Sequence, residues 1–221
     1  MKRYLHLGVV LLLAGCGSTE KQQAEPPSPP PEVEYATPIT TPARTVPFTV
    51  KGNVPDLVDR VVRALGQSGF AVDHVDRNAG IVTAKFQSDP ESYIDCGTLL
   101  MTADGSQAVT MSAATDRLRY DISLDQGTRV GTIDRIMVLD GRAIVRIKRS
   151  GFNVASVSTS GDYVLTRMAV LRTAGSEGAK RRKQYLAFGT GQAVHFDEGS
   201  TICQSNGRLE RDVLRPEDLA S

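Results

Sequence analysis

The stretch Ile136–Ile147, IMVLDGRAIVRI, gives the strongest indication of the fold. Two apolar runs rich in β-branched residues flank the dipeptide Asp140-Gly141. Asp-Gly in that setting is typical of a tight β-hairpin turn, because both central residues of such a turn need a positive φ. The stretch therefore predicts two antiparallel strands, 132–139 and 142–149, that meet at Asp140-Gly141.

More strands are predicted on both sides of this hairpin. They are predicted at 93–102, 108–114, 118–124, 153–159, 162–172, 184–188 and 192–197. Asp104-Gly105 and Ser160-Gly161 supply turn residues at two of the breaks. No long crossover separates successive strands, so the sheet is predicted to be antiparallel.

One amphipathic helix precedes most of these strands. Residues 53–56, Asn-Val-Pro-Asp, have the capping and proline chemistry of a helix start, and Gly66 or Gly69 is expected to end the helix. A single apolar stripe runs along it, formed by Leu57, Val58, Val61, Val62 and Leu65.

Shorter elements surround the helix. A strand at 48–50 precedes it, and a hairpin of 70–75 and 81–86, with a turn at 77–80, follows it. Leu209, Val213 and Leu214 predict a short C-terminal helix. The expected class is therefore α+β, with an antiparallel sheet packed on one main helix.

The N-terminus has the pattern of a lipoprotein signal peptide. Lys2 and Arg3 precede an apolar run from Leu5 to Ala14, which is too short to span a bilayer. The run ends in Leu-Ala-Gly-Cys at 13–16, which resembles the bacterial lipobox. The resemblance implies cleavage after residue 15, acylation of Cys16 and, because Gly17 follows, sorting to the outer membrane.

A proline-rich segment follows Cys16. Eight of the eleven prolines lie between residues 17 and 47. Such a composition predicts a disordered tether that reaches roughly 30 Å as a coil and about 95 Å when fully extended. The chain is thus divided into a signal peptide (1–15), a lipidated Cys and tether (16–47), one domain (48–216) and a tail (217–221).

The helix and its hairpin resemble a known module. Residues 54–65 run into a pattern of Gly69-Phe70, Val72, Asp76, Gly80 and Ile81-Val82-Thr83. This stretch is similar to the helix-grip module of BamC-type accessory lipoproteins of the outer-membrane β-barrel assembly machinery. It covers about 35 of the 221 residues. The resemblance implies a helix-grip-like fold and a non-catalytic envelope role, and it carries over no site residues.

The two remaining cysteines, Cys96 and Cys203, are predicted to form a disulfide, since the lipobox places them outside the cytoplasm. The alternative is a Cys96 nucleophile assisted by His74 or His195, which needs a base within hydrogen-bond reach. A zinc site is disfavoured because these residues lack paired ligand spacing. No cofactor or metal is expected.

The strongest local charge is Lys180-Arg181-Arg182-Lys183, which follows a Gly- and Ser-containing stretch. We expect it on a flexible loop, either merely solvated or in contact with anionic headgroups or an acidic partner.

The amino-acid composition excludes some classes of function. A net charge of +1 and a chain with 5% aromatic residues and no Trp argue against nucleic-acid binding. The leading expectation is a non-catalytic outer-membrane lipoprotein, with its domain in the periplasm, that binds another envelope protein. The alternative is a periplasmic carrier of a lipid or other apolar ligand.

Overall fold

The computed structural model describes residues 32–39, 43–102, 108–123, 129–173, 178–196 and 201–219. These residues are mostly β-structure, with 60% strand and 16% helix, and only one helix among them has seven or more residues. Their strands form three antiparallel sheets. The predicted α+β class with one main, helix-grip-like helix is therefore wrong, whereas the antiparallel pairing is confirmed.

Strands dominate the order of elements along the chain. The order is β1 (Glu32–Ala36), β2 (Phe48–Lys51), α1 (Val54–Gln67), β3 (Ala71–Asp76), β4 (Ile81–Ser88), η1 (Pro90–Ser92), β5 (Ile94–Asp95), β6 (Thr98–Thr102), β7 (Val109–Ser112), β8 (Arg117–Ser123), β9 (Arg129–Gly151), β10 (Val154–Thr173), β11 (Ala179–Gly189), β12 (Ala193–Phe196), β13 (Thr201–Ser205), α2 (Arg208–Asp212) and η2 (Pro216–Leu219).

One long hairpin organises the molecule. β9 and β10 pair from Gly131 opposite Thr173 to Gly151 opposite Val154. The chain reverses at Phe152-Asn153, where Asn153 has a φ of 53°. The turns predicted at Asp140-Gly141 and Ser160-Gly161 are therefore wrong, because both dipeptides lie inside continuous strands. Asp104-Gly105 lies outside the described residues.

The two glycines inside these strands serve packing. A Cβ at Gly141 would lie 2.1 Å from Cζ of Phe86, and one at Gly161 would lie 2.4 Å from Cδ2 of Leu209. Glycine within a strand often marks such a close approach. The absence of a side chain at these positions lets β4 and α2 pack directly onto the long strands.

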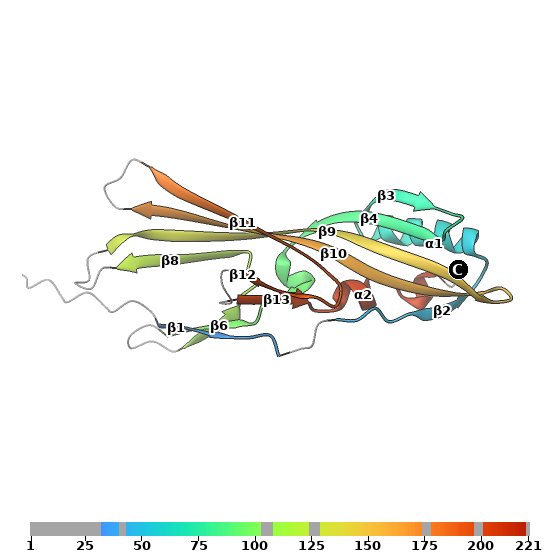
Figure 1. Cartoon of the computed structure of the whole chain (residues 1–221), viewed down its shortest axis with the longest axis horizontal. Helices are drawn as coiled ribbons and strands as arrows, with labels where there is room; N and C mark the ends of the chain where they lie inside the picture. The colour runs from blue at the N-terminus through green and yellow to red at the C-terminus, as the bar shows by residue number, and fades with distance from the viewer. Residues whose placement is uncertain are drawn as a thin grey trace, which may run out of the picture.

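Different strands flank the two halves of the hairpin. Near the Phe152 turn, β10 pairs with β2, and β9 pairs with β4, which pairs with β3. In the other half, β11 pairs with β10 and β8 pairs with β9. With a rise of about 3.3 Å per residue, the 23 residues of β9 span about 75 Å. Figure 1 shows the resulting elongated body.

Two small sheets and the helices cover one face of the long sheet. The small sheets, β1-β6-β7 and β12-β13-β5, lie below its β8–β11 half in Figure 1. α1 packs on β3, β4 and β9 near the turn, and also on η2. Its apolar stripe enters the common core, where Leu57, Val58, Val61 and Leu65 are fully buried. The helix therefore covers only one end of the sheet.

The predicted local structure around α1 is confirmed. Oδ1 of Asn53 accepts a hydrogen bond from the backbone N–H of Asp56 at 3.0 Å, which caps the helix. The hairpin β3–β4 follows as expected, with Gly80 at a φ of 65° in the turn. The short C-terminal helix is also present as α2.

The folded body extends beyond the expected domain limits. β1 lies within the segment 16–47, for which a disordered tether was predicted, and it pairs with β6. Leu219 lies in the predicted tail, yet it is fully buried, and its carbonyl accepts a hydrogen bond from Arg60 at 2.7 Å. The predicted signal peptide and the predicted lipidation site, Cys16, lie outside the described residues. Within those residues, the helices all fall short of the length and hydropathy that a membrane span requires.

Candidate interaction surfaces

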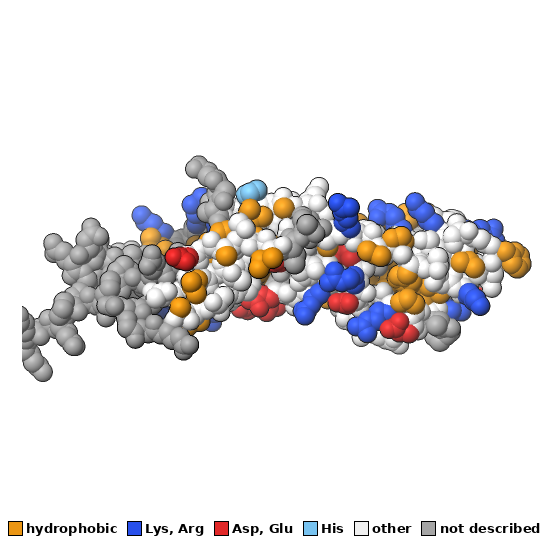
Figure 2. Space-filling model, turned by 90° about the horizontal axis from the view of Figure 1, so that it is seen from below, with side chains coloured by type: hydrophobic (Ala, Val, Ile, Leu, Met, Phe, Trp, Pro, Cys, Tyr) orange, Lys and Arg blue, Asp and Glu red, His pale blue; other side chains and the backbone are white. Residues whose placement is uncertain are grey.

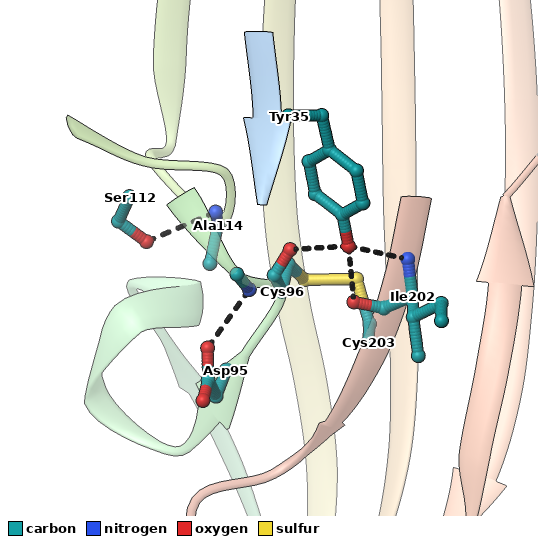
Figure 3. Close-up of a disulfide and its surroundings, with 8 residues drawn as sticks. Tyr35, Asp95, Cys96, Ser112, Ala114, Ile202 and Cys203 are labelled. Carbon is teal, nitrogen blue, oxygen red and sulfur yellow. Dashed lines mark hydrogen bonds between the residues drawn. A yellow bond between two sulfur atoms is a disulfide. The ribbon is translucent and has the colours of Figure 1, made fainter. Parts of the chain in front are cut away.

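The predicted disulfide between Cys96 and Cys203 is confirmed, and both residues are fully buried. Cys96 lies between β5 and β6, which belong to different small sheets, and Cys203 lies on β13, so the bond fixes the link between the two small sheets to β13 (Figure 3). With its sulfur in this bond, Cys96 has no thiolate, and the nucleophile hypothesis for Cys96 is wrong.

Tyr35 of β1 forms hydrogen bonds with backbone groups next to the disulfide. Its hydroxyl oxygen accepts a hydrogen bond from the N–H of Ile202 at 2.9 Å, and it donates toward the carbonyl of Cys96 at 3.1 Å (Figure 3). Sequence reasoning missed this residue because it lies within the proline-rich segment. The alternation of Val33 and Tyr35 with charged and small residues in EVEYA is the signal that would have indicated a strand.

The two histidines lie on different sheets. His74 is on β3 opposite Thr83, and His195 is on β12 opposite Ile202. Within the described residues, no group of three or more His, Cys, Asp or Glu side chains is arranged to hold a metal ion.

A charged cluster lies on the outer face of β3, β4 and β9. The carboxylate of Asp73 lies 3.4 Å from Nζ of Lys85 and 3.6 Å from the Arg142 guanidinium. A hydrogen bond from the Thr83 hydroxyl, and then these two cations, hold the pKa of Asp73 below its usual value. Lys85 and Arg142 also line a pocket of about 360 Å³, together with Asp140, Gly141, Asp162 and Val164.

A buried carboxylate binds three hydroxyl groups from separate elements. Glu210 of α2 is 3% exposed. Its Oε1 accepts hydrogen bonds from the hydroxyls of Tyr163 at 3.0 Å, Thr190 at 2.6 Å and Ser205 at 3.0 Å. This hydroxyl–carboxylate network, Tyr163, Thr190, Ser205 and Glu210, ties α2 to β10 and β13. No sequence signal joins four residues so far apart, so only the fold reveals it.

The network makes a prediction for alkaline pH. Burial, and then Glu210, raise the pKa of the Tyr163 phenol well above its usual value. Above pH of about 10 the unfolded chain loses this proton while the folded chain keeps it, so the free energy of unfolding should fall with pH, by about 1.4 kcal/mol per pH unit for one group. In urea unfolding between pH 9 and 11, Tyr163→Phe should show a shallower decline than the wild type. Equal slopes would contradict the prediction.

The basic run forms an exposed strand and not the flexible loop that was expected. Lys180, Arg181, Arg182 and Lys183 all lie in β11 and are exposed. Their register opposite β10 places Arg181 beside Val170 and Lys183 beside Met168. The expectation of a loop is therefore wrong, while the exposure of the four cations is as expected.

Tyr185 extends this charged surface. Its side chain is 62% exposed, and Nζ of Lys183 lies 5.6 Å from the centre of its ring. Because side chains alternate along a strand, Arg181, Lys183 and Tyr185 share one face of β11. We call these three residues together with Lys180 and Arg182 the basic edge.

β11 is also an edge of the long sheet. Within the described part of the chain it pairs only with β10. An edge strand presents backbone N–H and C=O groups that a strand of another chain can bind. The basic edge thus combines backbone hydrogen-bonding capacity, four cations and an exposed aromatic ring.

None of the protein-family models, curated proteins or solved structures compared with this chain matches it.

Proposed function

We propose that this chain is a non-catalytic, lipid-anchored binding module of the bacterial outer membrane, which contacts another envelope protein through the basic edge. The lipobox at 13–16 supports the anchor, and the exposed strand β11 is the observation that carries the binding role. The resemblance of residues 54–83 to BamC-type lipoproteins supports an assembly partner as the protein that is bound.

The start of β1 sets how far the folded body can stand from its anchor. Sixteen peptide units separate Cys16 from Glu32, and a fully extended chain of that length reaches at most about 55 Å. This is shorter than the reach expected of a tether that extends to residue 47. The module therefore operates close to the membrane that holds its acyl chains.

The charge of the basic edge specifies the partner's chemistry. A strand that pairs with β11 would bring its side chains beside Arg181 and Lys183 on one face and Lys180 and Arg182 on the other. Acidic side chains at alternate positions of the partner strand complement these cations, and like charges there would repel. The partner is therefore an acidic strand or strand edge of an envelope protein.

Crosslinking in living cells tests the proposal. A photoreactive residue at Tyr185 of the full-length chain should capture an outer-membrane β-barrel or one of its assembly proteins. Arg181→Glu with Lys183→Glu should reduce that capture about ten-fold, because both charges next to the partner are reversed. Mass spectrometry of the captured species provides the measurement.

A matched control makes the result specific. Arg44 and Arg63 are exposed and lie outside β11, so Arg44→Glu with Arg63→Glu changes the net charge equally and should leave the capture unchanged. Equal losses in both double variants would indicate a general charge effect. The basic edge could instead serve only to prevent β11 strands of neighbouring copies from pairing. In that case reversal of its charges should promote aggregation and leave the amount of captured protein unchanged, and the proposal fails.

A further inference from the structure

The turn of the long hairpin exposes a whole aromatic side chain. Phe152 is 97% exposed at the tip between β9 and β10. Figure 1 shows this turn at the right-hand end of the molecule, and Figure 2 shows a hydrophobic side chain projecting at that end. Phe152 thus stands at an extremity of the body and adds almost no buried surface to the fold.

The turn itself does not need an aromatic residue. Asn153 takes the left-handed conformation, with a φ of 53°, and the pairing register shifts between Val154 and Ala155. Asparagine tolerates this conformation, and small or polar residues are the usual occupants of such turns. The local backbone therefore gives no structural reason for phenylalanine at 152.

Three exposed cations lie near the turn in sequence or in strand register. Lys148 and Arg149 precede it on β9, and Lys51 lies on β2, opposite Val154 of β10. All three are exposed. The carboxylate of Asp56, in the first turn of α1, is hydrogen-bonded by Nδ2 of Asn53 at 2.7 Å. We call Lys51, Lys148, Arg149 and Phe152 the hairpin tip.

A small pocket lies beside the ring. Its volume is about 230 Å³, and Arg149, Phe152 and Val54 are among the residues that line it. A guanidinium next to an apolar wall suits a phosphate group that is attached to a glycerol or acyl chain. An apolar ring that projects among cations is also the arrangement by which proteins enter the interface of an anionic bilayer.

The hairpin tip lies far from the point at which the chain would leave its anchor. β1, the first described element after Cys16, pairs with β6 below the half of the long sheet that is remote from the turn (Figure 1). β9 alone spans about 75 Å toward the tip. A body held at the β1 end can therefore present its tip to a surface other than its own membrane.

We propose that the hairpin tip binds the anionic surface of a bilayer that faces the one holding the lipid anchor. Phe152 enters the interfacial region, and Lys51, Lys148 and Arg149 bind headgroup phosphates. The idea of a second, facing bilayer rests on the anchor of the proposed function. The proposal that the protein binds lipid depends only on the residues of the hairpin tip.

Vesicle capture tests this proposal with the full-length lipidated protein. Donor vesicles of phosphatidylcholine carry the protein, and fluorescent acceptor vesicles contain about 30% phosphatidylglycerol, whose anionic headgroups attract cations. The wild type should hold acceptor vesicles on the donor vesicles, whereas acceptor vesicles of pure phosphatidylcholine should be held several-fold less.

Variants of the tip should weaken capture without affecting folding. Phe152→Ser should reduce it about ten-fold, and Phe152→Leu should retain most of it, because an apolar side chain is preserved. Lys148→Glu with Arg149→Glu should reduce it at least about twenty-fold, at roughly five-fold for each cation removed. Val109→Ser is the matched control, since Val109 is 54% exposed on β7, away from the tip, and its capture should equal that of the wild type.

The outcomes separate the two proposals. Absence of capture by the wild type, or equal capture by Phe152→Ser, overturns the role of the tip. Capture of one envelope protein by a photocrosslinker at position 152 in cells, without vesicle capture, assigns the tip to a protein partner and also overturns it. If the protein does not float with the donor vesicles, the proposed lipid anchor is wrong. The role of the tip is then tested by flotation of the free protein with the acceptor vesicles, using the same variants.

Discussion

Loss of the Cys96–Cys203 disulfide should lower the free energy of unfolding by about 5 kcal/mol. The bond closes a loop with a sequence separation of 107 residues, and the chain-entropy model assigns a cost of that size to such a loop in the unfolded state. For a chain of this length the loss corresponds to a fall in Tm of about 15 °C. Urea unfolding with and without a strong reductant provides the measurement.

The cysteine variants should all lose the same amount of stability. Cys96→Ser, Cys203→Ser and the double variant should all lose a similar amount of stability, because each removes the same bond. Tyr35→Phe keeps the disulfide but leaves the N–H of Ile202 without its hydroxyl acceptor, so it should cost only about 1–2 kcal/mol. Stability losses that add in the double variant would show that the two cysteines act independently, contrary to this expectation.

Glu210→Ala should lower the free energy of unfolding by about 3 kcal/mol. The substitution removes the acceptor of three hydroxyl groups in a site where Glu210 itself is 3% exposed. Each buried donor that loses its partner costs about 1 kcal/mol or more. The free energy of unfolding of Glu210→Gln should lie between those of the wild type and Glu210→Ala, since the amide oxygen of glutamine still accepts one or two of these hydrogen bonds. Chemical unfolding followed by circular dichroism measures all three proteins.

Glu217 offers the matched control. Its side chain is 67% exposed and lies 3.9 Å from Arg215, so Glu217→Ala should change the stability by less than about 0.5 kcal/mol. If Glu210→Ala costs no more than this control, the hydroxyl–carboxylate network does not hold α2 in place. A double-mutant cycle with Tyr163→Phe should also give a coupling of about 1 kcal/mol, because the two side chains share a hydrogen bond.

Local signals predicted the elements whose causes are local. The cap at Asn53 and the apolar stripe of α1 depend on residues three or four positions apart, and the turn before Gly80 depends on its own four residues. The disulfide could also be predicted, because two cysteines permit only one pairing. Among the candidate contact residues, Lys180–Lys183 were identified as exposed cations. Their place in a strand was not, since four charges interrupt the alternation that would have indicated β11.

The antiparallel nature of the sheet, the helix α1 and the pairing of Cys96 with Cys203 all follow from the amino-acid sequence alone. The continuation of the strands through Asp140-Gly141 and Ser160-Gly161 is set by the tertiary structure, because Phe86 and Leu209 occupy the space above those glycines. The tertiary structure also makes β1 part of the body and brings Glu210 to three hydroxyls. These features depend on contacts between residues that are distant in the chain, and no local pattern encodes which of them will meet.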